Sequence, residues 1–243
     1  MASGHSPLAQ FEVKSLIPMH VGDLDVSFTN ASAFMVLAVV VSSVFLIAGV
    51  KRNAAVPGRW QSLSELMYVF VANLVRDTIG SEGRAFFPLV FTIFIFILFG
   101  NLLGMIPYGF TFTSHIIVTF AMAAVIFVGV TLLAIYKHGL RFFTFFLPPG
   151  VPMWMAPLLV PIEIISYFVR PVSLSLRLAA NMMAGHTLLK VFAGFVVLLG
   201  LAGVVPLVFV VLLTGLEIII ACLQAYVFAI LTCLYINDAI HLH

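Results

Sequence analysis

The chain has 243 residues, of which 63% are hydrophobic and only 8% are charged, and its mean hydropathy is +1.22. A soluble domain carries roughly 25% charged residues, so a water-soluble fold is excluded. The formal net charge of +2 is too small to indicate binding to nucleic acid. A membrane-crossing helix needs roughly 20 apolar residues, and the apolar runs predict five such helices in a single all-α membrane domain.

The first apolar run covers residues 31–50 and contains no charged residue. Three basic residues follow it, Lys51, Arg52 and Arg59. Positive charge gathers on the inner side of membrane proteins, so residues 1–30 are expected outside. Residues 60–80 place apolar side chains at helical spacing opposite polar ones, which predicts an amphipathic helix at the inner interface. Its apolar members are Leu63, Leu66, Met67, Phe70, Val71 and Leu74.

The second predicted span, residues 85–106, ends at the turn sequence Pro107-Tyr108-Gly109. The third, residues 115–136, returns to the inside, because basic residues follow it: Lys137, His138 and Arg141. A proline-rich loop then leads into a helix that we expect to begin near Pro157. The prolines of this region are Pro148, Pro149, Pro152, Pro157 and Pro161.

The fourth and fifth predicted spans, residues 157–200 and 204–237, are longer than a perpendicular crossing needs. Such lengths predict strong tilt or a break, with Pro171 and Pro206 as candidate bends. The sequence shows no internal repeat, which argues against transporters built from duplicated halves.

Ionisable residues concentrate in these last two spans. Six polar residues recur three or four positions apart, which keeps them on one helix face: Glu163, Ser166, Arg170, Ser173, Arg177 and Asn181. An arginine at mid-membrane costs on the order of 2.5 to 3.5 kcal/mol, so its presence indicates a function. His186 lies nine residues past Arg177, half a turn away in facing, with Lys190 one turn further.

The returning helix carries Glu217 and Gln224, seven residues apart and therefore on one face. We expect His186 and Glu217 to meet at a similar depth. The pattern predicts two polar routes that do not join, an inner one lined by Glu163 and an outer one lined by His186 and Glu217. Glutamate and histidine suit proton relay, whereas the guanidinium of Arg177 stays charged, blocks a direct leak and attracts a carboxylate on a partner.

The run SLSLRLAANMMAGH, residues 173–186, resembles the motif of subunit a of F-type ATP synthases, the stator subunit that faces a rotating ring of c subunits. The match extends to Glu163, Asn181, Glu217 and Gln224. GNLLGMIPY at residues 100–108, LTCLYINDAIH at residues 231–241 and the hydropathy layout of nearly the whole chain agree with it.

The resemblance implies that Arg177 faces the proton-carrying carboxylate of each passing c subunit while two offset half-channels load and unload it. Many bacterial members carry an acid at the position of His186 and a histidine at that of Glu217. Here the two are exchanged, as in mitochondrial and related bacterial forms. Implied partners are the c-ring, peripheral-stalk b-type subunits and the lipid bilayer, in a bacterial inner or a mitochondrial inner membrane. Soluble subunits would make the ATP, and no nucleotide-binding loop, cofactor or metal site is expected in this chain.

Other interpretations of the same residues stay open at this point. A stand-alone transporter or channel would use Arg177 as an anion site, and a purely structural membrane protein would use the polar stripe as interhelical contacts. Arg170 could anchor the helix or hold a lipid headgroup, and Glu163 could stabilise a helix N-terminus. Asn181 and Gln224 could form interhelical hydrogen bonds alone. Ser173 and Lys190 are possible supporting residues, with Lys190 expected to reach the outer interface.

Overall fold

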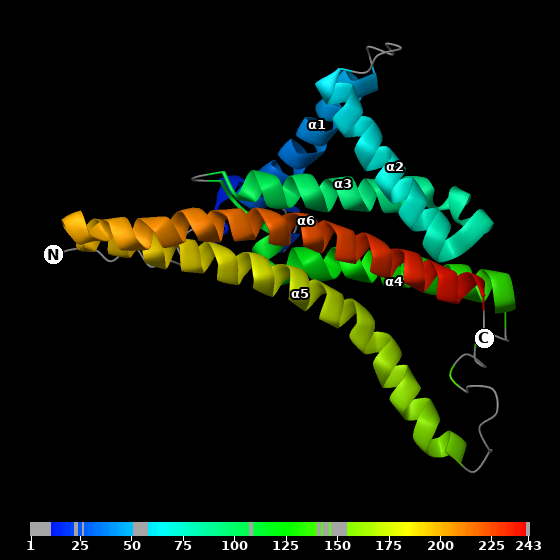
Figure 1. The fold of residues 1–243 in the computed structure, drawn as a ribbon. Helices are drawn as coiled ribbons and strands as arrows, with labels where there is room; N and C mark the ends of the chain where they lie inside the picture. The colour runs from blue at the N-terminus through cyan, green and yellow to red at the C-terminus, as the bar shows by residue number, and fades with distance from the viewer. Residues whose placement is uncertain are drawn as a thin grey trace.

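The computed structural model describes residues 11–21, 24–25, 27–50, 58–106, 109–139, 142, 146 and 155–241. Five of its helices are long and apolar enough to cross a membrane, which makes the protein an all-α membrane protein. They are α1 (Asn30–Val50), α3 (Phe87–Gly104), α4 (Ile116–His138), α5 (Ala156–Leu198) and α6 (Val204–Ile240) (Figure 1). Between them lie the helix α2 (Arg59–Ile79) and the 3₁₀ helices η2 (Gly80–Ala85), η3 (Phe112–Ser114) and η6 (Gly200–Gly203).

Some features expected from the sequence lie outside the described residues. These are the basic residues Lys51, Arg52 and Arg141, the turn residues Pro107 and Tyr108, and the loop prolines Pro148, Pro149 and Pro152. The described end of the proline-rich region is the start of α5 at Ala156, one residue before Pro157. Proline in this first turn costs no hydrogen bond, because the first helical N–H groups have no intrahelical partner.

The two long helices α5 and α6 lie side by side, and α6 also packs against α2, α3 and α4 (Figure 1). Helix α5 continues through Pro161 and Pro171, and its N-terminal part curves away from α6. Interior prolines remove a hydrogen bond and clash with the preceding turn, so a bend in this part is the expected response. Pro206 is the other candidate bend. It lies in the first turn of α6, where proline is tolerated.

Helix α2 forms a V-shaped hairpin with α1 and packs against α3 and α6 (Figure 1). Its buried side is the stripe Ser64, Val71, Val75 and Ile79. This differs from the single apolar face that the sequence pattern favoured, because several of those expected residues are exposed: Leu63, Leu66 and Phe70. The helix is apolar on two sides, one against the bundle and one turned outward, so periodicity alone could not select the buried side.

Short strands precede α1, in a segment for which the sequence predicted only an external position. Strands β1 (Ser15–Ile17) and β4 (Phe28–Thr29) pair antiparallel, as do β2 (His20–Val21) and β3 (Leu24–Asp25). The side chain of Asn30 ties this segment to α1. Its Nδ2 donates to the carbonyl of Glu12 at 3.0 Å, and its Oδ1 accepts from the amide of Lys14 at 3.1 Å.

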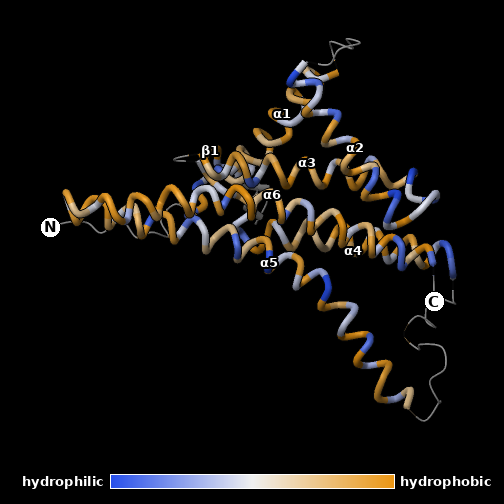
Figure 2. Tube along the Cα trace, in the orientation of Figure 1, coloured by the Kyte–Doolittle hydropathy of each residue, from blue (hydrophilic) through white to orange (hydrophobic). Residues whose placement is uncertain are grey.

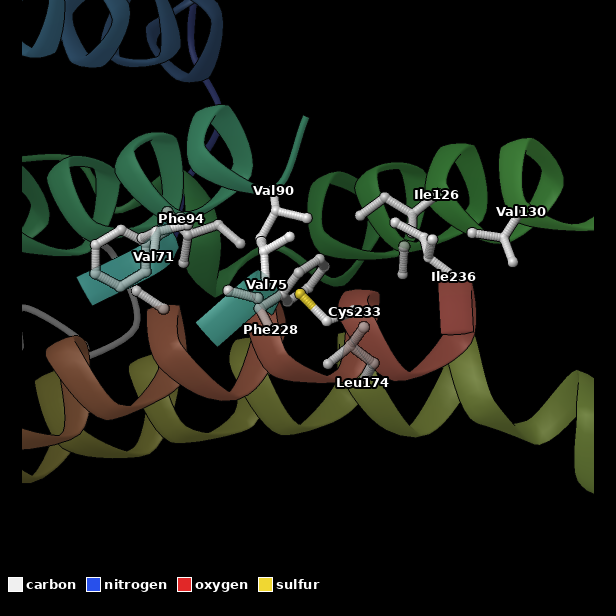
Figure 3. Close-up of a cluster of buried hydrophobic side chains, with 14 of the residues drawn as sticks. Val71, Val75, Val90, Phe94, Ile126, Val130, Leu174, Phe228, Cys233 and Ile236 are labelled. Carbon is white, nitrogen blue, oxygen red and sulfur yellow. The ribbon is translucent and has the colours of Figure 1, made fainter. Parts of the chain in front are cut away.

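The apolar core lies where α2, α3, α4, α5 and α6 converge (Figure 3). Val71 and Val75 of α2 and Phe94 of α3 meet Phe228 and Cys233 of α6 there. Helix α6 also buries alanines at a spacing of four, Ala221, Ala225 and Ala229. Small residues at this spacing let membrane helices approach closely, and the same side of α6 carries Glu217 and Gln224. Packing of the core therefore fixes the direction of both polar side chains.

Candidate functional site

A buried polar contact joins His186 of α5 to Glu217 of α6. Nδ1 of His186 lies against Oε1 of Glu217, and both residues are buried. The spacing of polar residues in the sequence predicted this meeting. Gly185 makes the approach possible, because a Cβ at that position would lie 2.8 Å from Oε1 of Glu217. A close interhelical contact at this depth thus depends on a residue without a side chain.

The other ring nitrogen of His186 contacts two atoms near the end of α3. Nε2 lies 2.9 Å from the carbonyl oxygen of Gly104 and 2.9 Å from Oγ1 of Thr111. Oγ1 of Thr111 itself donates to Gly104 O at 3.2 Å. A carbonyl oxygen only accepts, so these contacts assign a proton to Nε2, and the threonine oxygen accepts as a second partner.

This assignment leaves one position for a mobile proton. Nδ1 of His186 and Oε1 of Glu217 are in direct contact, so a single proton lies between them. Either the carboxylic acid donates to a neutral ring, or the imidazolium donates to a carboxylate. The pair can therefore accept and release a proton without moving either helix.

An outer cavity of about 830 Å³ opens onto this pair. Its wall is built from the N-terminal segment, the end of α3, α5 and α6. The polar and charged residues around it are Glu12, Lys14, Asn30, His186, Lys190, Thr214 and Glu217. Lys190 is exposed at the cavity. Water that enters such a space reaches a buried carboxylate and a buried imidazole.

Arg177 lies on a different side of α5 from His186. Its side chain is exposed on the bundle surface, and three other members of the stripe share that exposure: Ser166, Ser173 and Asn181. An adjoining side of the helix carries the buried residues Leu174, Leu178 and Met182. Arg177 is therefore exposed on a helix that is long and apolar enough to cross a membrane, an arrangement that is costly unless a partner covers it.

Toward the inner end of α5, Glu163 is half-buried and Arg170 turns toward α6. Nη1 of Arg170 donates to Oδ2 of Asp238 at 3.1 Å. The guanidinium also lies 5.9 Å from the ring of Tyr167 and 5.7 Å from that of Tyr235. These contacts connect α5 to α6 at the bend and account for Arg170 as an anchoring residue.

Gln224 is buried on the same side of α6 as Glu217, two turns further in. Asn101 of α3 lies next to this row, and its Nδ2 donates to the carbonyl of Ala221 at 3.3 Å. Its Oδ1 is buried and has no hydrogen-bond partner among the described residues. Three buried polar side chains, Glu217, Asn101 and Gln224, thus follow one another along the interface of α3 and α6.

Comparison with known proteins decides the family. Residues 32–237 match the protein family described as ATP synthase A chain. The chain belongs to the ATP synthase A chain family. Proteins named ATP synthase subunit a are similar over almost their whole length. That of Paramagnetospirillum magneticum is 53% identical over 245 residues, covering 98% of this chain and 99% of the relative. That of Pelagibacter ubique is 56% identical over 240 residues, covering 98% of each.

Membership of the ATP synthase A chain family selects among the interpretations left open by the sequence. The chain is a subunit of a membrane-embedded assembly, so the interpretations as a stand-alone transporter and as a purely structural protein are set aside. An outward-facing arginine on a membrane helix is understandable in such a subunit, because partner subunits can cover it.

The sequence analysis did not predict two residues of this site, Thr111 and Asn101. Asn101 stood out as a polar residue within the otherwise apolar second span, so a signal existed. Thr111 carried none, because it belongs to a short polar stretch after that span, and only the return of the chain past α3 brings it to His186.

Replacing Thr111 with valine should slow proton-driven ATP synthesis about three- to tenfold. Valine keeps the shape but removes the oxygen beside Nε2 of His186, and one hydrogen bond contributes about 0.5 to 1.5 kcal/mol. Initial rates in membrane vesicles, normalised to assembled enzyme, measure the effect. Thr111→Ser should recover most of the rate, and Thr92→Val, which removes only a local bond to Pro88 O, should change little. Equal rates for Thr111→Val and Thr92→Val would contradict the role of Thr111.

Proposed function

We propose that this chain, the proton-translocating stator subunit of an F-type ATP synthase, moves protons through two half-channels separated by Arg177. The observation that carries the proposal is that two sides of α5 present different functional groups. Its buried side holds His186 against Glu217 at the outer cavity, while its exposed side presents Arg177 to a partner. A proton that enters the cavity therefore meets the pair of His186 and Glu217. The fixed positive charge of Arg177 lies on another side of the same helix.

The outer half-channel begins at the cavity and passes through the buried pair. The single proton position between Nδ1 of His186 and Oε1 of Glu217 lets the pair take a proton from water and give one onward. Asn101 and Gln224 continue the polar row along α6, and the free Oδ1 of Asn101 offers an acceptor on that path. The route ends at the carboxyl group of a ring subunit.

Arg177 separates this route from the inner one. A guanidinium does not release its proton in proteins, so it cannot relay and instead blocks direct passage. Its charge stabilises the ionised form of a nearby carboxyl group, so a ring carboxyl that approaches Arg177 loses its proton. The proton leaves toward the inside along the stripe that ends at Glu163, about 21 Å away along α5 for fourteen residues at ~1.5 Å each.

The partners of this arrangement are ring proteolipids of the c type, which carry the reacting carboxyl group, and b-type subunits of the peripheral stalk. The relatives are bacterial, so the bacterial plasma membrane is the proposed location. Moving one charge through 100 mV is worth ~2.3 kcal/mol, so several protons must pass for each ATP. The ring supplies that ratio by rotating.

Disulfide cross-linking tests whether the Arg177 face meets the ring. Asn181 is exposed one turn past Arg177, so Asn181→Cys should cross-link to a cysteine placed near the ring carboxyl group. A disulfide requires Cα atoms within about 7 Å, which makes the reaction specific. The background should lack both native cysteines, Cys222 and Cys233. Val36→Cys, exposed on α1, is the control and should not react with the ring. Absence of a cross-link at position 181, in assembled enzyme, would reject the proposed facing.

A further inference from the structure

A second cavity of about 700 Å³ lies at the corner where α2 ends and α3 begins. The corner is formed by Gly80, whose φ of 81° lets the chain leave α2 and enter η2. Figure 2 shows hydrophilic residues gathered at this corner, next to the apolar helices. The cavity is lined by Tyr68, Ala72, Asn73, Val75, Arg76, Gly80, Ser81, Arg84 and Phe87.

The charge at this cavity is positive and uncompensated by the lining. Arg76 and Arg84 both line it, and among the described residues neither guanidinium forms an ion pair. The two nearest acids in the sequence, Asp77 and Glu82, do not line it. Glu82 is held elsewhere, because Nζ of Lys137 lies 2.7 Å from its Oε2. This hydrogen bond and charge lower the pKa of Glu82, so its carboxylate is ionised beside Lys137.

The remaining lining divides into polar and apolar parts. Asn73 and Ser81 add hydrogen-bonding groups beside the arginines, whereas Ala72, Val75 and Phe87 are apolar. Two guanidinium groups with amide and hydroxyl neighbours match an anion with several acceptor oxygens, such as a phosphodiester. The apolar part would be of no use to a small free anion, but it suits the first carbons of an acyl chain.

The cavity also lies at the end of a membrane-crossing helix, where lipid headgroups are expected. Phe87, one of its lining residues, is the first residue of the membrane helix α3. The corner is joined through Glu82 to Lys137 at the end of α4, and His138 contacts Ala239 at the end of α6. Three membrane helices thus end or begin here, on the side where the basic residues predict the inner surface.

We propose that this cavity binds the phosphate headgroup of an anionic phospholipid of the inner leaflet. Arg76 and Arg84 hold the phosphodiester, Asn73 and Ser81 complete its hydrogen bonds, and the acyl chains descend along Phe87 and Ala72. The site is separate from the proton route, since it shares no residue with the outer cavity or the stripe of α5.

Lipid retention by the purified holoenzyme tests the proposal. Enzyme solubilised in mild detergent is titrated with short-chain phosphatidylglycerol, and bound lipid is counted by native mass spectrometry. Arg76→Gln and Arg84→Gln should each weaken the tightest phosphatidylglycerol site about tenfold, and the double variant should lose one bound lipid per complex. Arg59→Gln is the matched control, because it removes an exposed arginine at the opposite end of α2 and should retain that lipid.

Three outcomes would overturn the proposal. The first is unchanged lipid retention in both single variants, which are measurable even if the double variant does not assemble. The second is equal competition by millimolar inorganic phosphate, which would assign the cavity to a free anion. The third is cross-linking of Arg76→Cys to an acidic segment of another subunit with the lipid count unchanged, which would assign it to a protein contact.

Discussion

Replacing Arg177 with alanine is expected to abolish proton-driven ATP synthesis in membranes that carry the whole enzyme. Without the guanidinium, a carboxyl group of the ring that releases its proton at this position has no positive charge to stabilise the carboxylate. Removing one partner of a buried ion pair costs on the order of 3 to 5 kcal/mol, and each 1.36 kcal/mol changes a rate tenfold. The initial rate should therefore fall by about a hundredfold or more.

The measurement uses inverted vesicles energised by an imposed pH difference and membrane potential, with rates normalised to assembled enzyme. Arg59→Ala removes an exposed arginine at the start of α2 and should leave the rate near that of the unmodified enzyme. Arg177→Lys should remain severely impaired, because a desolvated lysine can release its proton and lacks the planar fork. Retained synthesis in Arg177→Ala would show that this charge is not required.

Exchanging His186 and Glu217 should preserve much of the activity that either single exchange destroys. His186→Glu alone puts two carboxyl groups in contact within a buried site, and Glu217→His alone leaves two imidazoles. Neither arrangement shares one proton between an acid and a ring, so each single variant should lose at least about tenfold. The double variant restores the acid and imidazole pair and should recover a large part of the loss.

The comparison is a double-mutant cycle, in which the departure from additivity measures the coupling between the two side chains. Glu82 and Lys137 provide a matched control, since they form an exposed ion pair between η2 and α4. Their single and double exchanges should all stay near the unmodified rate, because exposed pairs contribute little. A double exchange of His186 and Glu217 that is no better than the worse single variant would argue against a shared proton.

Helix positions and the phase of polar residues are local properties, and the sequence predicted them well. The observed helices begin and end within three residues of the expected ranges, because a 20-residue apolar run has few alternatives in a membrane. The opposite facing of Arg177 and His186 follows from nine residues at 100° each, and the structure has it. The contact of His186 with Glu217 was also predictable, since both are costly in lipid and lie on helices that adjoin.

Only the tertiary structure decided the other contacts between helices. Thr111 reaches His186 because the chain folds back after α3, and Arg170 meets Asp238 because α5 and α6 pack side by side. Helix α2 buries Val75 and Ile79 while exposing Leu63, although both sides are apolar. These outcomes depend on long-range packing, whereas the sequence by itself specified the helices and the polar groups that each helix carries. Periodicity fixes a residue's direction on its own helix, but the partner that it meets depends on how all the helices pack together.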